Sequence, residues 1–178
     1  LGTAFHADLT VSFACEKLGT VLFPGSDYAG EVIPVEIGIG TKLFEENPEV
    51  CYTLEKSDLS KFLPDRKKNS HKGSYGKILM ITGSKGMSGA AYLSARAAYI
   101  SGGGLVQIYT EESNRTILQQ LLPEAIVSTY TEYEEEKLQS LLKWADVICI
   151  GCGLGKSRTA GQILSYLMKY AEVPCAID

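Results

Sequence analysis

Long apolar stretches are missing from this 178-residue sequence, in which no uninterrupted run approaches the ~20 residues that cross a bilayer. No basic and then apolar leader is visible at its start. The chain is acidic, with a net charge of -4 and a pI near 5.3, which disfavours nucleic acid or an anionic membrane as its main partner. We therefore expect a cytoplasmic protein that binds neither nucleic acid nor membrane.

A disulfide pattern is missing too. The five cysteines are odd in number and show no repeating spacing, so reduced thiols are expected. Cys149 and Cys152 form one C-x-x-C pair, a spacing that also occurs in redox and zinc sites. No second pair and no nearby histidine completes a ligand set, so we favour small buried apolar roles for these thiols over metal or redox use.

The sequence does contain enough apolar surface for a core. Hydrophobic residues make up 45% of the chain and charged residues 21%. The mean hydropathy of +0.02 fits this balance, which is typical of one globular domain with additional segments.

Short strands and helices alternate after residue 76, which predicts a parallel sheet with helices on both faces. Lys77 to Thr82 is an aliphatic run bounded by glycines, as in a buried central strand. Ser88 to Ser101 is rich in Ala and Ser, and the glycines that follow it can take the left-handed conformation that ends a helix. The further predicted strands are 105–110, 125–130, 147–151 and 173–178, and the further helices are 114–122, 134–144 and 159–170.

The N-terminal part of the chain has a different character. Residues 7–14 and 32–40 are predicted strands around a loop that contains Gly and Pro. Residues 41–69 are rich in Lys, Glu, Asp and Pro, which is typical of a solvated linker, with a short helix expected over 58–63. Lys67 and Lys68 would steer an anion only if they rimmed a site, and we favour a solvated face for them.

Two glycine-rich loops follow predicted strands. Residues 83–91 (GSKGMSGAA) lead into a helix, and residues 151–155 (GCGLG) follow a later strand. Glycine permits positive φ and close approach of the backbone, and a helix N-terminus favours phosphate. Carboxyl ends of parallel strands meet at one edge of a sheet, so the two loops suggest a single ligand site. A glycine turn alone is a weak signal, and a purely structural role for each loop stays open.

The amino-acid sequences of these motifs resemble those of the ATP/ADP-dependent NAD(P)H-hydrate dehydratase family, a branch of the ribokinase-like fold. The resemblance spans roughly residues 66–178, about the first half of a dehydratase domain. The family often has proline where Cys152 stands, a difference expected to change loop stiffness more than chemistry. The matching segments are HKGSYG at 71–76, GSKGMSGAA at 83–91, GGGLV at 102–106, Pro123 with Glu124, and GCGLG at 151–155.

The resemblance implies a domain order. Residues 1–40 are similar to the C-terminal strands of the Rossmann-like NAD(P)H-hydrate epimerase domain, which in many bacteria is fused ahead of the dehydratase. Residues 41–69 would be the linker, and residues 70–178 the N-terminal half of the α/β, ribokinase-like dehydratase domain. The epimerase's active-site motifs lie upstream of such a segment, so no epimerase activity is expected of this chain.

The resemblance also assigns site residues. No catalytic residue is expected in this chain, because the family's nucleotide-binding lysine segment, Thr-Pro-His loop and Gly-Gly-x-Gly-Asp motif would follow its last residue. We favour loop packing or a substrate edge for His71 over general-base work. The implied substrate contacts are Gly89, Ala90, Ala91, Gly151, Gly153 and Asp178, and the implied loop contacts are His71, Lys72 and Ser84.

The implied reaction is a dehydration of the (S)-epimer of NAD(P)H hydrate, driven by ADP or ATP with magnesium. The nucleotide would phosphorylate the ring hydroxyl, and loss of phosphate would restore the dihydronicotinamide. The family suggests a homo-oligomer. Two other functions stay open, a kinase of the ribokinase superfamily acting on a vitamin precursor or sugar, and a non-catalytic nucleotide-binding module.

Overall fold

The computed structural model describes residues 2–40, 42–45, 47, 49–63 and 65–178. The chain divides into two compact units, Leu1–Pro64 and Asp65–Asp178. The predicted linker begins at Thr41, which lies outside the described residues. No helix in the described part of the chain has the length and apolar character needed to cross a membrane.

The first unit is built on two parallel strands, β1 (Leu9–Phe13) and β2 (Glu31–Val35), and both lie within the predicted strand segments apart from one residue of β2. The strand predicted over 32–40 is too long, because β2 loses its partner where β1 ends and Gly38 then takes a φ of +81°. The short helices not predicted from sequence are α1 (Leu18–Val21), α2 (Ser26–Ala29) and α3 (Lys42–Glu45). The short helix expected over 58–63 is η1 (Lys56–Asp58) with α4 (Leu59–Phe62).

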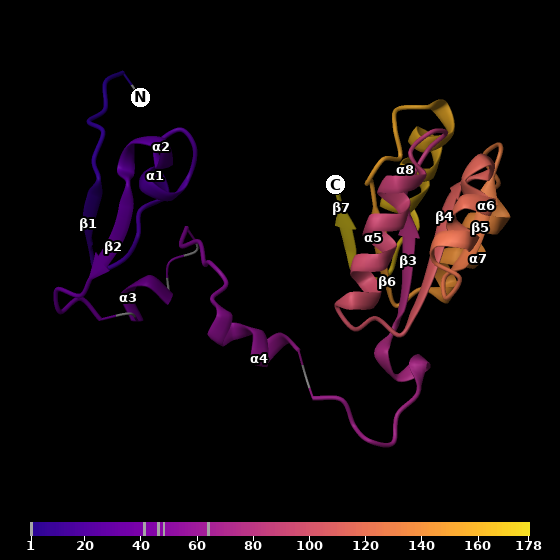
Figure 1. Cartoon of the computed structure of the whole chain (residues 1–178), viewed down its shortest axis with the longest axis horizontal. Coiled ribbons are helices and arrows are strands. Elements are labelled where there is room, and N and C mark those ends of the chain that lie inside the picture. Colours follow the sequence, from indigo (N-terminus) through magenta and orange to yellow (C-terminus); the bar gives the residue numbers. More distant parts are fainter. Residues whose placement is uncertain (1, 41, 46, 48, 64) are drawn as a thin grey trace. The chain divides into compact units, whose positions relative to one another are not determined.

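The second unit contains a five-stranded, fully parallel sheet in the order β5-β4-β3-β6-β7 (Figure 1). The short η2 turn (Lys72–Tyr75) leads into the central strand β3 (Lys77–Ile81). The other strands are β4 (Leu105–Glu111), β5 (Ile126–Tyr130), β6 (Val147–Ile150) and β7 (Cys175–Ile177). The helices are α5 (Ser88–Ile100), α6 (Arg115–Leu121) after the η3 turn (Glu112–Asn114), α7 (Glu135–Trp144) and α8 (Arg158–Tyr170).

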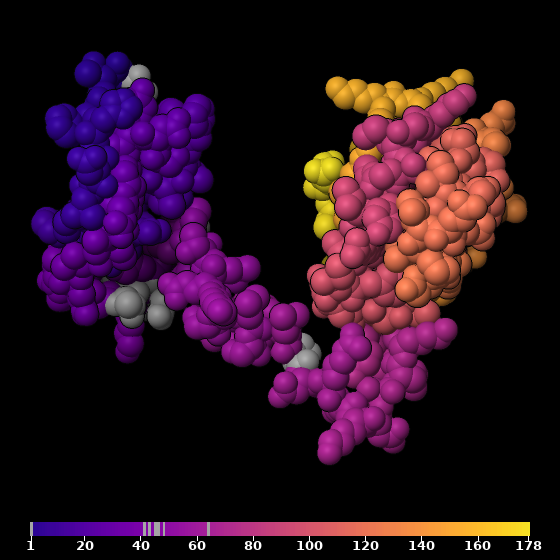
Figure 2. Space-filling model, viewed as in Figure 1, coloured from indigo at the N-terminus to yellow at the C-terminus, as the bar shows by residue number. Residues whose placement is uncertain are grey.

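Helices cover both faces of this sheet, as the alternation of elements predicted. Side chains alternate along β3, so Met80 packs with α5 and α6 on one face while Leu79 and Ile81 pack with α7 and α8 on the other. Each face therefore has its own apolar cluster. The edge strand β7 is exposed, and Figure 2 shows the last residues, in yellow, at the margin of this unit.

Local sequence explains where these elements begin and end. Helix α6 stops at Leu121, because the residue before Pro123 is pushed out of the helical region. Helix α7 begins among glutamates, with Glu135 and Glu136 in its first turn, where negative charge is favourable. Helix α5 ends at Ile100, and Gly102, two residues later, takes a φ of +102°. The predicted strands and helices of this unit are thus confirmed to within a few residues.

Candidate functional site

The β3–α5 loop turns sharply at the carboxyl end of the central strand. Gly83 and Gly86 have φ values of +76° and +81°, a region that glycine enters without strain. A Cβ added at Gly83 would lie 2.8 Å from the Cβ of Ala91 and 3.0 Å from the Oγ1 of Thr110. Small residues at positions 83 and 91 therefore let the strand end pack directly on the first turns of α5.

The β6–α8 loop is the second predicted glycine loop. Gly151, Gly153 and Gly155 all have positive φ, at +135°, +71° and +75°. Ser157 then caps α8, its hydroxyl accepting a hydrogen bond from the backbone N–H of Ala160 at 3.1 Å. This loop thus consists of a run of left-handed turns that delivers the chain to the start of α8.

The two loops are joined by hydrogen bonds. The N–H of Gly83 donates to the carbonyl of Cys152 at 2.9 Å, and the Ser84 hydroxyl donates to the carbonyl of Gly153 at 2.8 Å. A Cβ added at Gly153 would lie 2.6 Å from the Cβ of Ala90, so the backbone of one loop touches the helix that follows the other. The structure brings the two predicted loops together at one edge of the sheet.

The predicted residues at this edge lie close to one another. Beyond the Ala90 contact with Gly153, a Cβ at Gly151 would lie 2.6 Å from the carbonyl oxygen of Asp178. The N–H of Asp178 donates to the carbonyl of Ile150 at 2.9 Å. Gly89 differs from these residues, because a Cβ there would meet nothing within 4 Å. The first turn of α5 is therefore open on the Gly89 side.

A cavity of about 350 Å³ lies beside the joined loops. It carries two ammonium groups, from Lys85 and Lys156, and one carboxylate, from Glu111. Of the predicted site residues, Ser84 lines it. The lining comes from the carboxyl ends of several strands and the start of α8: Ser84, Lys85, Glu111, Tyr130, Thr131, Leu154, Gly155, Lys156, Ser157 and Thr159.

Two predicted loop contacts, His71 and Lys72, lie elsewhere. They precede β3 and so stand at its amino end, whereas Ser84 stands past its carboxyl end. His71 Nδ1 accepts the N–H of Gly73 at 3.1 Å, and a Cβ added at Gly104 would lie 1.8 Å from the Lys72 carbonyl oxygen. The HKGSYG segment thus packs against the start of β4, and the structure does not bring it to the glycine loops.

Asn114 and Thr110 were not predicted from sequence, although they hold the first glycine loop. The Asn114 amide donates to the Ser84 carbonyl at 3.0 Å and to Thr110 Oγ1 at 2.9 Å, and Thr110 donates to the Gly83 carbonyl at 3.1 Å. The contacts with Ser84 and Gly83 join residues 30 and 27 positions apart, which no local pattern records. The only sequence signal is an asparagine just before a helix, and it predicts a cap that the side chain does not form.

An ion pair lies next to Asn114 in the sequence. Arg115 Nε contacts Glu112 Oε1 at 2.8 Å, and both side chains also hydrogen-bond the Thr129 hydroxyl on β5. The hydrogen bond from Arg115 is the main cause that lowers the pKa of Glu112 from 4.5 to about 2. The turn that carries Asn114 is thereby tied to the neighbouring strand.

Cys149 lies on β6, just before the second glycine loop. Burial is the main cause that raises the pKa of the Cys149 thiol, which favours the protonated, unreactive form. In the residues that the structure describes, no group of three or more His, Cys, Asp or Glu side chains could hold a metal ion.

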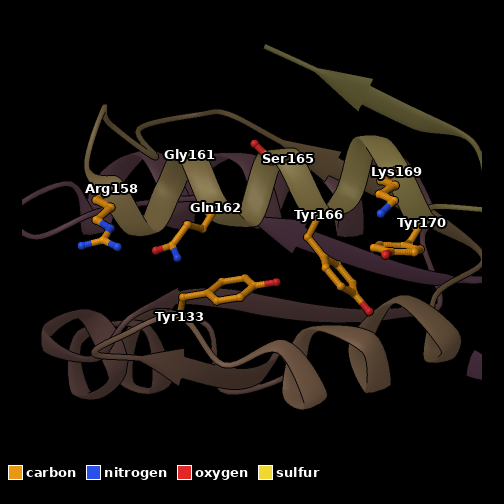
Figure 3. Close-up of a pocket in the computed structure, with 8 residues that line it drawn as sticks. All are labelled: Tyr133, Arg158, Gly161, Gln162, Ser165, Tyr166, Lys169 and Tyr170. Carbon is orange, nitrogen blue, oxygen red and sulfur yellow. The ribbon is translucent and has the colours of Figure 1, made fainter.

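A larger cavity of about 480 Å³ lies along α8 and contains none of the predicted residues (Figure 3). Three tyrosines form its aromatic side. The ring centroid of Tyr166 lies 6.4 Å from that of Tyr133 and 4.5 Å from that of Tyr170. In Figure 3, Tyr133 approaches from the segment after β5 and faces the side chains of α8. Only the smaller of these two cavities adjoins the joined glycine loops.

Comparison with known proteins gives consistent matches. Residues 78–178 match the family described as NAD(P)H-hydrate dehydratase. The chain is 34% identical over 177 residues to a bifunctional NAD(P)H-hydrate repair enzyme of Coxiella burnetii, covering 99% of this chain and 36% of that protein. It is 41% identical over 116 residues to an ADP-dependent (S)-NAD(P)H-hydrate dehydratase of Lactiplantibacillus plantarum, covering 65% of this chain and 41% of that one.

Solved structures are also similar. A ribokinase-like superfamily protein of Enterococcus faecalis matches with a TM-score of 0.62 and 32% identity, over 71% of this chain and 46% of that one. An ADP/ATP-dependent NAD(P)H-hydrate dehydratase of Bacillus subtilis, co-crystallised with ATP/Mg²⁺, matches with a TM-score of 0.54 and 32% identity, over 65% and 41%. The chain therefore spans less than half the length of each of these proteins.

Proposed function

This chain belongs to the NAD(P)H-hydrate dehydratase family, and on that basis we propose that it supplies substrate-binding loops to an enzyme that dehydrates the (S)-epimer of NAD(P)H hydrate with ADP or ATP. The phosphoryl group of the nucleotide passes to the ring hydroxyl of the hydrate. Phosphate then leaves together with a proton from the neighbouring ring carbon, and this elimination restores the dihydronicotinamide double bond. The names of the relatives from Lactiplantibacillus plantarum and Bacillus subtilis support this choice of substrate and nucleotide.

The observation that carries the proposal is that hydrogen bonds join the two glycine loops at one edge of the sheet. The Ser84 hydroxyl holds the Gly153 carbonyl at 2.8 Å, and no Cβ fits at Gly83 or Gly153. The glycines at these positions let the two loops pack closely together at one edge of the sheet, the edge at which open α/β folds bind their ligands. A dinucleotide hydrate has a pyrophosphate and a flat hydrated ring, and we infer that both lie against this paired edge.

The open first turn of α5 supports the same role. Gly89 has free space around it, and α5 is 13 residues long, so the positive end of its dipole faces that space. The proposed contacts are therefore Gly89 and Ala90 at the start of α5 and Gly151 and Gly153 on the β6–α8 loop, whereas Ala91 is buried and packs on the Gly83 position. Asp178 adjoins Gly151 and would contact the same ligand.

The charged cavity suits one part of the dinucleotide. Small-molecule pockets hold roughly 300–1,000 Å³, and the volume of about 350 Å³ is enough for a fragment of such a ligand. The ammonium groups of Lys85 and Lys156 would offset phosphate charge, while Glu111 favours hydroxyl groups of a ribose over a second phosphate. Tyr130, which is almost fully buried, lies at the wall of this cavity.

Magnesium and the nucleotide belong to the proposal as well, since one similar structure was crystallised with ATP/Mg²⁺. No cluster of metal ligands occurs among the described residues, so the proposed roles of this chain's residues involve no metal ligand. The epimerase origin of residues 1–40, the homo-oligomer and the cytoplasmic location are further parts of this proposal.

The test is recovery of dihydronicotinamide absorbance when the full-length natural protein meets (S)-NADPH hydrate, magnesium and ADP or ATP. We expect recovery only with a nucleotide. A Gly89→Val variant, which fills the open first turn of α5, should raise the KM for the hydrate, whereas Gly161→Ala, in α8 but outside the lining of the cavity beside the loops, should not. Absence of recovery with either nucleotide would overturn the proposal.

A further inference from the structure

We propose that Asn114 is a positioning residue that holds both substrate loops in their binding geometry. This inference rests on the proposed function, because it assumes that the loops at Gly83 and Gly153 contact the hydrate. Asn114 lines neither of the two cavities described above. Asn114 would therefore affect the ligand only indirectly, through its hydrogen bond to Ser84.

Burial makes the Asn114 contacts strong. The side chain is only 1% exposed, and its amide group donates two hydrogen bonds, to the Ser84 carbonyl and to the Thr110 hydroxyl. Burial of a polar group lowers the stability of the folded protein unless the group is hydrogen-bonded. The two hydrogen bonds of the Asn114 amide offset that cost. The Thr110 hydroxyl is buried too, and it donates a hydrogen bond to the Gly83 carbonyl, so Asn114 is connected to Gly83 as well.

The backbone around Asn114 leaves its side chain available for this role. Asn114 ends the η3 turn in a helical conformation, with φ -84° and ψ -16°, and the turn continues directly into α6. The start of the η3 turn is capped by the Glu111 side chain, which accepts the N–H of Ser113. The Asn114 amide donates to a loop 30 residues earlier in the chain.

The hydrogen bonds from Asn114 continue to the second loop. Ser84 receives the Asn114 amide at its carbonyl and donates its hydroxyl to the Gly153 carbonyl. Gly83, whose carbonyl is held by Thr110, donates its N–H to Cys152. A single, partly buried network therefore connects the ends of β3, β4 and β6. Loss of the Asn114 amide would loosen both loops at once.

The test compares two variants with the same chemical change in the full-length protein. Asn114→Asp keeps the shape of the side chain but removes both donors. Gln107→Glu is the matched control, because Gln107 is a buried amide near the start of β4 that donates to Ser128 at 2.9 Å, away from the loops. Hydrogen exchange is measured over residues 82–91 and 151–157, with the KM and kcat for the hydrate.

We expect Asn114→Asp to speed exchange in both loops and to raise KM about tenfold with kcat within about twofold, because the loops bind substrate and transition state alike. Gln107→Glu should lower the melting temperature without either effect. Equal loop exchange in the two variants, or unchanged KM for Asn114→Asp, would overturn the proposal. If the wild-type protein has no dehydratase activity, the proposed function fails, and loop exchange alone then decides whether Asn114 positions the loops.

A second pair of variants covers the case in which Asn114→Asp does not fold. Thr110→Val removes the hydroxyl that links Asn114 to Gly83, whereas Thr110→Ser keeps it. Faster loop exchange and higher KM in the valine variant, with near wild-type values in the serine variant, support the network. The same response from both variants would contradict it.

Discussion

At the scale of single residues, Gly153 is the position where backbone conformation and packing coincide. Its φ of +71° would cost an alanine about 1–2 kcal/mol, and the new Cβ would also press on Ala90 at 2.6 Å. We predict that Gly153→Ala lowers the free energy of unfolding by about 2–3 kcal/mol. Gly161→Ala, in α8 with open space around it, should instead raise it by about 0.5–1 kcal/mol. Urea denaturation of both variants checks the opposite signs.

Two buried threonines at adjacent strand ends make a second residue-scale prediction. Thr110 has hydrogen-bond partners on both sides, while the Thr82 hydroxyl has none among the described residues. Thr110→Val should therefore cost about 1–3 kcal/mol by leaving the Asn114 and Gly83 groups unpaired, and Thr82→Val should cost less than about 1 kcal/mol. Thermal denaturation of the two variants measures this contrast. Equal losses would mean that Thr82 has a partner, such as a buried water.

At the scale of elements, the Glu112 ion pair ties the η3 turn to β5. The pKa of Glu112 falls from 4.5 to about 2 because Arg115 stabilises its carboxylate. The ion pair therefore contributes its full stability above pH 4.5 and loses it as the pH falls toward 2. We predict that wild-type protein loses stability more steeply than Glu112→Gln over this interval. Unfolding curves at a series of pH values test this, and parallel pH dependences would contradict it.

At the scale of the whole chain, the buried core is unevenly shared between the two units. In the first unit, only Ser12 and Ala29 are buried among the described residues, whereas the second unit has an apolar cluster on each face of its sheet. Resistance to unfolding and proteolysis should therefore differ between them.

Limited trypsin digestion of the 178-residue chain checks this difference. Exposed Lys67 and Lys68 lie outside any helix or strand, and cleavage there should leave a fragment that begins within a few residues of Asn69. Arg96 in α5 and Lys143 in α7 are exposed as well, but their helices pack on the sheet and should protect them. Intact mass identifies the fragment. Equally fast cleavage at Arg96 or Lys143 would contradict the prediction.

The sequence alone determined the element order of the second unit, because the alternation of short apolar runs with amphipathic segments is a local property. It also predicted the two glycine loops and their meeting at one sheet edge, since the carboxyl ends of parallel strands share that edge. Only the tertiary structure decided which other residues join them. His71 carries a family motif but lies at the amino end of β3, and Asn114 carries none yet holds Ser84, because contacts between distant segments depend on strand order and side-chain packing.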